Sequence, residues 1–167
     1  MLALFVMGLT CGTTSIAVMG QSVADLSVAA PVGVIVAAIA FFLACYVELG
    51  KLPFDLAEAE QELQEGPLSE YSGPSLAMAK MALSMKQTII IAWFIAIFLP
   101  WGAATELTVP AILLGIPFFL IKMAVIFFLC SVFENVVSRV RYKLVGRQTW
   151  CIVALAAFAF VLCALGL

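Results

Sequence analysis

The chain has 167 residues, of which 65% are hydrophobic and 11% are charged, and its mean hydropathy is +1.20. A globular domain of this length cannot bury so much apolar surface, so the composition excludes a water-soluble globule and indicates an integral membrane protein. The net charge of −2 arises from clustered charges, and we do not expect nucleic acid as a partner.

Membrane-spanning helices need about 20 apolar residues each, and five segments of the chain meet this requirement. In chain order they are Met1–Met19, Pro31–Val47, Pro74–Leu99, Pro110–Phe133 and Thr149–Leu167. We therefore predict an all-α, polytopic membrane protein with about five transmembrane helices, forming a single membrane domain over residues 1–167.

The middle of the first segment, Thr10–Ser15, is small and polar. Such residues allow close helix contacts and local hydrogen bonds in membranes. They could also line a path for water, and the sequence leaves both interpretations open.

Between the second and third segments lies an acidic loop, residues 48–73, which carries seven of the ten carboxylates. Asp55 resembles a helix cap and Gly66 with Pro67 ends the run, which predicts a short helix over Leu56–Glu65. At about 100° per residue, one face of this helix would carry several of the acids. These acids are Glu58, Glu62 and Glu65, whereas Glu60 falls on the apolar side.

The spacing of these acids is unfavourable for a simple surface helix. Glu58 and Glu62 form a like-charge pair four residues apart, which costs a few tenths of a kcal/mol. Clustered carboxylates that are partly shielded from water can exchange protons near neutral pH, or can bind a basic surface. Three interpretations remain: a solvated face, a docking surface and a proton-handling group.

Basic residues are found in only two of the four connections between the segments. The first and third connections contain Asp25 and Glu106 but no lysine or arginine. The positive-inside rule then places the acidic loop and the basic connection in the cytoplasm, with the N-terminus inside and the C-terminus outside. The basic residues that set this orientation are Lys51, Arg139, Arg141, Lys143 and Arg147.

Charged residues inside the apolar segments are candidates for function. Lys122 lies near the centre of the fourth segment, five residues after Pro117, where a lysine costs about 3 kcal/mol on insertion scales. It should face protein or water, either on a proton or ion path or in a structural ion pair. Lys86 is a second candidate of this kind, whereas Lys80 is close enough to the membrane edge to snorkel.

At the end of the fourth segment, Glu134 lies two helical turns before Arg141, and the two would form a surface ion pair if the helix continues. No histidine occurs, and the five cysteines never have the C-x-x-C spacing of a metal site. We therefore expect no cofactor and no independent catalysis in this chain.

The run from Glu48 to Leu63, ELGKLPFDLAEAEQEL, followed by EYSG at residues 70–73, resembles the signature loop of the NADH dehydrogenase subunit 1 family. This family comprises the H subunit of complex I and its relatives in membrane-bound hydrogenases. The resemblance covers essentially the whole chain, but members of the family are about twice as long. The chain resembles their C-terminal half.

Within the family, three stretches resemble the formate hydrogenlyase subunit 4 branch of hydrogenase-4 type complexes. They are GPLSEYSGP at residues 66–74, the pair Lys86–Gln87, and FENVVSRVR at residues 133–141. Complex I members carry Glu-Tyr in the helix after the loop, where this chain has Leu83–Ser84. This departure argues against a complex I style proton entry and a quinone site.

The resemblance implies a membrane subunit of a group 4 nickel-iron hydrogenase in the cell inner membrane, with catalysis belonging to the assembly. The implied partners are the hydrogenase large and small subunits and a ferredoxin-like subunit, which hold Ni-Fe and Fe-S centres, together with antiporter-like membrane subunits. The H subunit of complex I (NADH-quinone oxidoreductase), a scaffold without a proton role and an independent cation transporter are the alternatives. The implied coupling acids are Asp55, Glu58, Glu60, Glu62 and Glu70; Lys86, Lys122 and Glu134 join them as candidates, and Glu65, Arg139 and Arg141 are docking candidates.

Overall fold

In the computed structural model, the residues described are 2–25, 30–51, 54, 70–104, 108–137 and 142–166, without the side chains of 142–145. Their regular structure is helical: α1 (Leu2–Cys11), α2 (Ile16–Ala24), α3 (Pro31–Glu48), α5 (Gly73–Phe98), α6 (Val109–Val136) and α7 (Tyr142–Ala164). Four helices are long and apolar enough to cross a membrane, and α1 with α2 make up to a fifth span. This confirms the predicted all-α, multi-pass membrane fold. The predicted helix Leu56–Glu65 lies outside the described residues.

Prolines mark the beginnings of three long helices. Pro31, Pro74 and Pro110 occupy the first or second position of α3, α5 and α6. A proline suits this position because its fixed φ angle is helical and the first turn does not need its missing N–H donor. The predicted starts of these helices are therefore correct to within one residue.

The first apolar segment differs from a single straight span, because α1 and α2 are bent by 66° at a short break. Gly12 adopts a left-handed backbone with φ of 64°, and the Thr13 N–H donates to the Gly8 carbonyl at 3.2 Å. These features end α1 as a glycine C-cap does. The Thr10 hydroxyl donates to the Val6 carbonyl at 3.1 Å and lies 3.0 Å from the Met7 carbonyl, which supports the structural interpretation of this polar stretch.

The helix after the break, α2, packs closely on α5. A Cβ atom built on Gly20 would lie 2.4 Å from the backbone carbonyl oxygen of Ala96. Side chains at this contact would push the two backbones apart, so only glycine fits. Small residues commonly allow such close approach between membrane helices.

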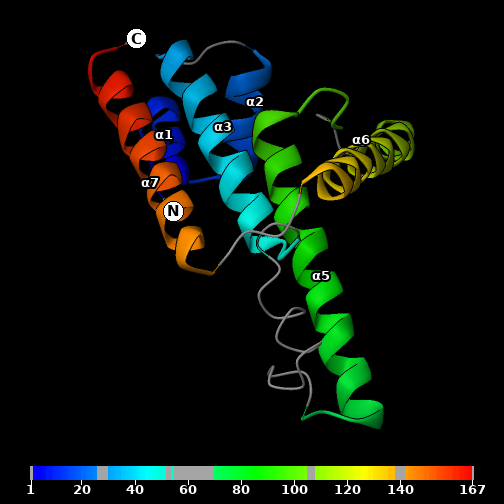
Figure 1. Ribbon diagram of the computed structural model, residues 1–167. Helices are drawn as coiled ribbons and strands as arrows, with labels where there is room; N and C mark the ends of the chain where they lie inside the picture. Colours follow the sequence, from blue (N-terminus) through cyan, green and yellow to red (C-terminus); the bar gives the residue numbers. More distant parts are fainter. Residues whose placement is uncertain are drawn as a thin grey trace.

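The core of the bundle lies around α3, with α1 and α7 on one side and α5 on the other (Figure 1). Val6, Ala37 and Ala159 are completely buried where α1, α3 and α7 meet. On the opposite side, aromatic rings join α3 to α5, with Phe42 and Phe94 centroids 5.3 Å apart. Small aliphatic side chains therefore pack α3 against α1 and α7, and aromatic rings pack α3 against α5.

One helix, α6, packs on the rest of the bundle only at its edge. Figure 1 shows it nearly end-on, whereas α3, α5 and α7 run along the plane of the picture. Its buried residues are Ile126 and Cys130, which pack in a cluster with Tyr46 and Ile91 of α3 and α5. The other side chains of α6 are largely apolar and exposed, as expected of a lipid-facing helix.

The charged connections lie at one end of the bundle. The C-terminal end of α3 and the N-terminal end of α7 lie at the same end (Figure 1). Near this end, Lys51 after α3 lies within ion-pair distance of Glu134 in the last turn of α6. We call this the loop end, because the acidic loop connects α3 to α5 there.

Candidate functional site

Four charged side chains from three parts of the fold gather at the loop end. Glu48 Oε2 lies 2.7 Å from Lys86 Nζ, and Lys51 Nζ lies 3.7 Å from Glu134 Oε2. We call these four residues the charged cluster. It joins the end of α3 to α5 through one ion pair and to α6 through the other.

The first ion pair of the cluster is open to its surroundings. The exposed fractions of the side chains are 61% for Glu48 and 50% for Lys86. Exposed pairs of this kind contribute about 0–1 kcal/mol to stability. The pair therefore adds little to the stability of the bundle, and its chemical interest is that a carboxylate and an ammonium group lie within hydrogen-bond distance.

The second ion pair is more enclosed, with exposed fractions of 38% for Lys51 and 28% for Glu134. Tyr46 lies beside it, is only 5% exposed, and packs edge-on against Phe133 with ring centroids 5.1 Å apart. Edge-to-face rings of this kind are worth about 0.5–1.5 kcal/mol beyond the area that they bury. The aromatic contact thus holds the end of α6 against α3 and keeps Glu134 near Lys51.

The chain leaves α3 in a fixed direction. Gln87 Nε2 of α5 donates to the Leu49 carbonyl at 2.9 Å, which satisfies a carbonyl at the end of α3. Gly50 follows in the left-handed conformation with φ of 64°, and its N–H donates to the Val47 carbonyl at 3.1 Å. This cap turns the chain toward α6 and brings Lys51 to Glu134.

A charge swap tests the first ion pair. Lys86→Glu should lower the thermal stability of the purified protein slightly, because two exposed carboxylates would then face each other where Glu48 and Lys86 now meet. The double variant Glu48→Lys with Lys86→Glu should restore the melting temperature. If the single and double variants melt at the same temperature, the two side chains do not interact.

The cluster contains two of the residues predicted from the sequence, Lys86 and Glu134. A third predicted residue, Glu70, is not part of the cluster and is exposed in the turn before α5. Glu134 pairs with Lys51, and its predicted partner Arg141 is outside the described residues. The other predicted residues that lie outside the described part are Asp55, Glu58, Glu60, Glu62, Glu65 and Arg139.

Lys122 lies apart from the cluster, beside the opposite end of α5. Its Nζ donates to the Leu99 carbonyl at 2.7 Å and to the Trp101 carbonyl. Leu99 caps the C-terminal end of α5, and the negative end of the helix dipole stabilises a cation at this place. Lys122 also lines a cavity of about 280 Å³ together with Gln21 of α2. It therefore faces protein, and its observed partners are backbone carbonyls.

Lys80 is exposed on the part of α5 near the loop end. The Ser84 hydroxyl, at one of the two positions where the chain departs from complex I members, donates to the Lys80 carbonyl at 3.1 Å. This local bond satisfies the hydroxyl within its own helix. The described part of the chain contains no group of three or more histidine, cysteine or acidic residues that could hold a metal ion.

The sequence did not predict a functional role for four residues of the site: Glu48, Lys51, Gln87 and Tyr46. Glu48 and Lys51 stood in the resembling motif, but nothing local assigned their partners. The signal that could have found them is their position at a predicted helix end, opposite the charges predicted on α5 and α6. Tyr46 carried no such signal, because an aromatic residue in an apolar segment is ordinarily part of the core.

Several apolar helices with an ion-pair cluster at one end define a polytopic membrane protein with charged groups at the membrane edge. The NADH dehydrogenase family model matches residues 1–165, and the chain belongs to this family.

Curated relatives include three informative matches. Hydrogenase-4 component C of Escherichia coli K12 is 43% identical over 99% of this chain and 52% of its own length. Formate hydrogenlyase subunit 4 of the same strain is 38% identical over 96% of this chain and 52% of its own length. The H subunit of the NADH-quinone oxidoreductase of Parvibaculum lavamentivorans is 31% identical over 66% of this chain and 33% of its own length. The chain spans about half the length of the first two relatives.

Proposed function

We propose that the chain serves as a membrane subunit of a group 4 nickel-iron hydrogenase complex, of formate hydrogenlyase or hydrogenase-4 type. In this role it anchors a peripheral redox arm and contributes to proton transfer. The observation that carries the proposal is the charged cluster, in which two acid–base pairs join the end of α3 to α5 and to α6. The higher identity and fuller coverage of the two hydrogenase relatives favour this role over that of the H subunit of complex I.

Two ion pairs of the charged cluster support a role in proton transfer. Each brings a carboxylate and an ammonium group within ion-pair distance, and a proton can move between an acid and a base over a hydrogen bond or one water. Glu134 is the more enclosed acid of the two and lies where α6 ends. Protons would pass between the acidic loop and the membrane interior through this acid.

In the proposed complex this chain holds none of the metal centres. The Ni-Fe and Fe-S centres belong to the large, small and ferredoxin-like subunits of the peripheral arm, and antiporter-like subunits lie beside the chain in the membrane. We place the loop end in the cytoplasm of the cell inner membrane, with the N-terminus inside and the C-terminus outside, because the basic connection lies there.

Neutralising the enclosed acid tests the proton role. Glu134→Gln keeps the size and polarity of the side chain but removes its titratable group. Proton-linked hydrogen evolution by membrane vesicles should fall severalfold, while the amount of assembled complex should change little because the ion pair is weak. The control is Asp25→Asn, an exposed acid at the end of α2, which should leave turnover unchanged. Equal losses of turnover and assembly in Glu134→Gln would favour a purely structural anchor.

A further inference from the structure

The cavity of about 280 Å³ that Lys122 lines lies at the end of α5 opposite the loop end. Its walls come from α2, from the C-terminal end of α5, from residues 100–104 and from the first half of α6. Glycines and alanines supply more than half of the lining, which leaves the space open. A water molecule occupies about 30 Å³ in the liquid, so the cavity has room for several.

The ammonium group of Lys122 needs a further partner in this cavity. It has three N–H donors, and in the described part of the chain the Leu99 and Trp101 carbonyls accept from it. The third N–H needs an acceptor, because a charged donor without a partner is unstable away from water. Gln21 adds a side-chain amide to the α2 wall. Water in this cavity would therefore meet several polar groups, as buried water requires.

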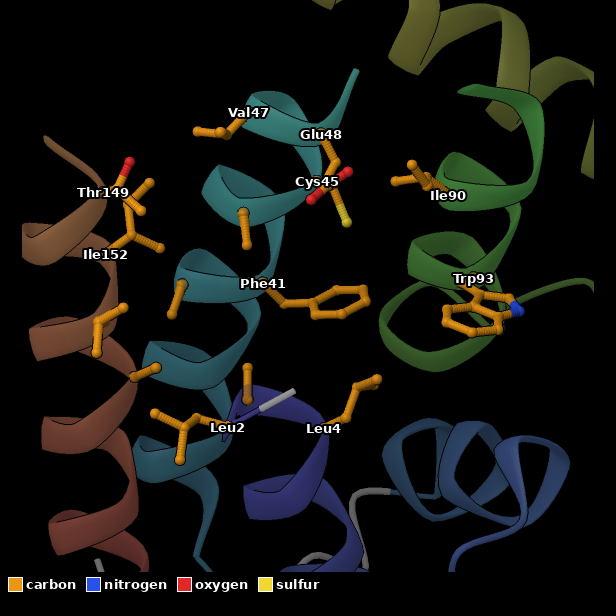
Figure 2. Close-up of a pocket in the computed structure, with 15 residues that line it drawn as sticks. Leu2, Leu4, Phe41, Cys45, Val47, Glu48, Ile90, Trp93, Thr149 and Ile152 are labelled. Carbon is orange, nitrogen blue, oxygen red and sulfur yellow. The ribbon is translucent and has the colours of Figure 1, made fainter. Parts of the chain in front are cut away.

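The larger cavity, between α1, α3, α5 and α7, has a different lining. Figure 2 shows that Glu48 is charged there, whereas most of the other side chains, such as Phe41 and Ile152, are apolar. Apolar walls give water few partners, and in a bilayer they give lipid tails little net preference. The chemistry of the lining therefore identifies an occupant for the cavity at Lys122 and none for the larger cavity.

The cavity at Lys122 opens where polar groups mark the membrane surface. In its lining, Gln21 and residues 102–104 are exposed. Asp25 directly follows α2 and is exposed, and a carboxylate is costly in the hydrocarbon region. Trp101 is 61% exposed, and tryptophan is enriched at the membrane–water interface. The open side of the cavity therefore faces the membrane surface opposite the loop end.

We propose that water fills this cavity and connects the Lys122 ammonium group with the aqueous phase opposite the loop end. The non-helical backbone of residues 99–104 supports this, because irregular backbone in membrane proteins is buried in protein or lines a water-filled cavity. One part of the inference rests on the proposed function: in a chain that transfers protons, this water carries them between Lys122 and that side of the membrane. The hydration itself does not depend on the proposed function.

Radiolytic labelling tests the hydration in the native chain. X-rays generate hydroxyl radicals from water, and these radicals oxidise nearby side chains, which mass spectrometry then measures in protein held in lipid nanodiscs. Phe119 lines the cavity and is 36% exposed, whereas Phe128 is 68% exposed on the same helix, outside the lining. Phe119 should be oxidised severalfold faster although it is the less exposed ring. If Phe128 is oxidised as fast as Phe119, or faster, the cavity is not filled with water and the proposal is wrong.

A cavity-filling variant tests the proton path. Ala24→Leu enlarges a side chain of the cavity wall, and Ala124→Leu makes the same change at an exposed position of α6 outside the lining. Ala24→Leu should slow the oxidation of Phe119 and lower proton-linked turnover severalfold, whereas Ala124→Leu should change neither. Ala17→Leu, on the same wall, replaces Ala24→Leu if that variant does not assemble.

The outcomes separate this inference from the proposed function. Slower oxidation of Phe119 with normal turnover would overturn the proton path through this water. Normal turnover in Glu134→Gln, together with rapid oxidation of Phe119, would contradict the proposed function but support the hydration of the cavity.

Discussion

Replacing Lys122 by methionine should reduce proton-linked turnover more than it reduces the amount of assembled complex. The variant loses charged hydrogen bonds to the Leu99 and Trp101 carbonyls, each worth about 1.5–3 kcal/mol. It also removes a charge from a membrane helix, which relieves about 3 kcal/mol on insertion scales. The two bonds together are worth about 3–6 kcal/mol, so the gain on insertion offsets at least half of this loss and the reduction in assembly is limited. The loss of a titratable group from the cavity beside α2 is not offset by either term.

Lys122→Arg separates a proton role from a structural one. Arginine keeps the charge and can reach the same carbonyls, but it does not release its proton at any physiological pH. Assembly should be retained, and turnover should be nearly as low as in the methionine variant. Both variants are measured by hydrogen evolution and by a proton-sensitive dye in vesicles. Wild-type values in the methionine variant would show that Lys122 only caps α5.

Gly20→Ala should disrupt the packing of α2 on α5 and strongly lower the yield of folded protein. The added methyl group would lie 2.4 Å from the Ala96 carbonyl oxygen, and backbone cannot rotate away as a side chain can. Overpacking of this kind costs about 1–3 kcal/mol or more. The measurement is the yield of monodisperse protein after mild detergent extraction, together with its thermal stability.

The matched control is Gly8→Ala in α1. A Cβ there would meet the Thr13 carbonyl oxygen at 3.5 Å and Met19 Cε at 3.7 Å, which are ordinary contacts. Alanine is also the better helix former by about 1 kcal/mol, so this variant should be at least as stable as the native chain. Equal stability of the Gly20 and Gly8 variants would contradict the close contact between α2 and α5.

The helices themselves were predictable because their causes are local. Long apolar segments must be helical in a membrane, where every backbone polar group needs a partner within the segment. Prolines then set the beginnings of α3, α5 and α6. The polar stretch Thr10–Ser15 predicted close helix contacts or a path for water within one span, not a break. The 66° bend between α1 and α2 depends on how α2 packs against α5, which the apolar pattern does not reveal.

The candidate site was predictable only in part, for the same reason. Lys86 and Glu134 stood out because a charge in or beside an apolar segment is costly and rare. Their partners, Glu48 and Lys51, are distant along the chain, and pairing requires that α5 and α6 both cross α3 near its end. Lys122 was identified from its depth, but its partners are backbone carbonyls, which every residue has. The sequence thus shows where a charged side chain costs free energy, because the surrounding segment is apolar. Only the packing of the helices determines which group becomes the partner of that charge.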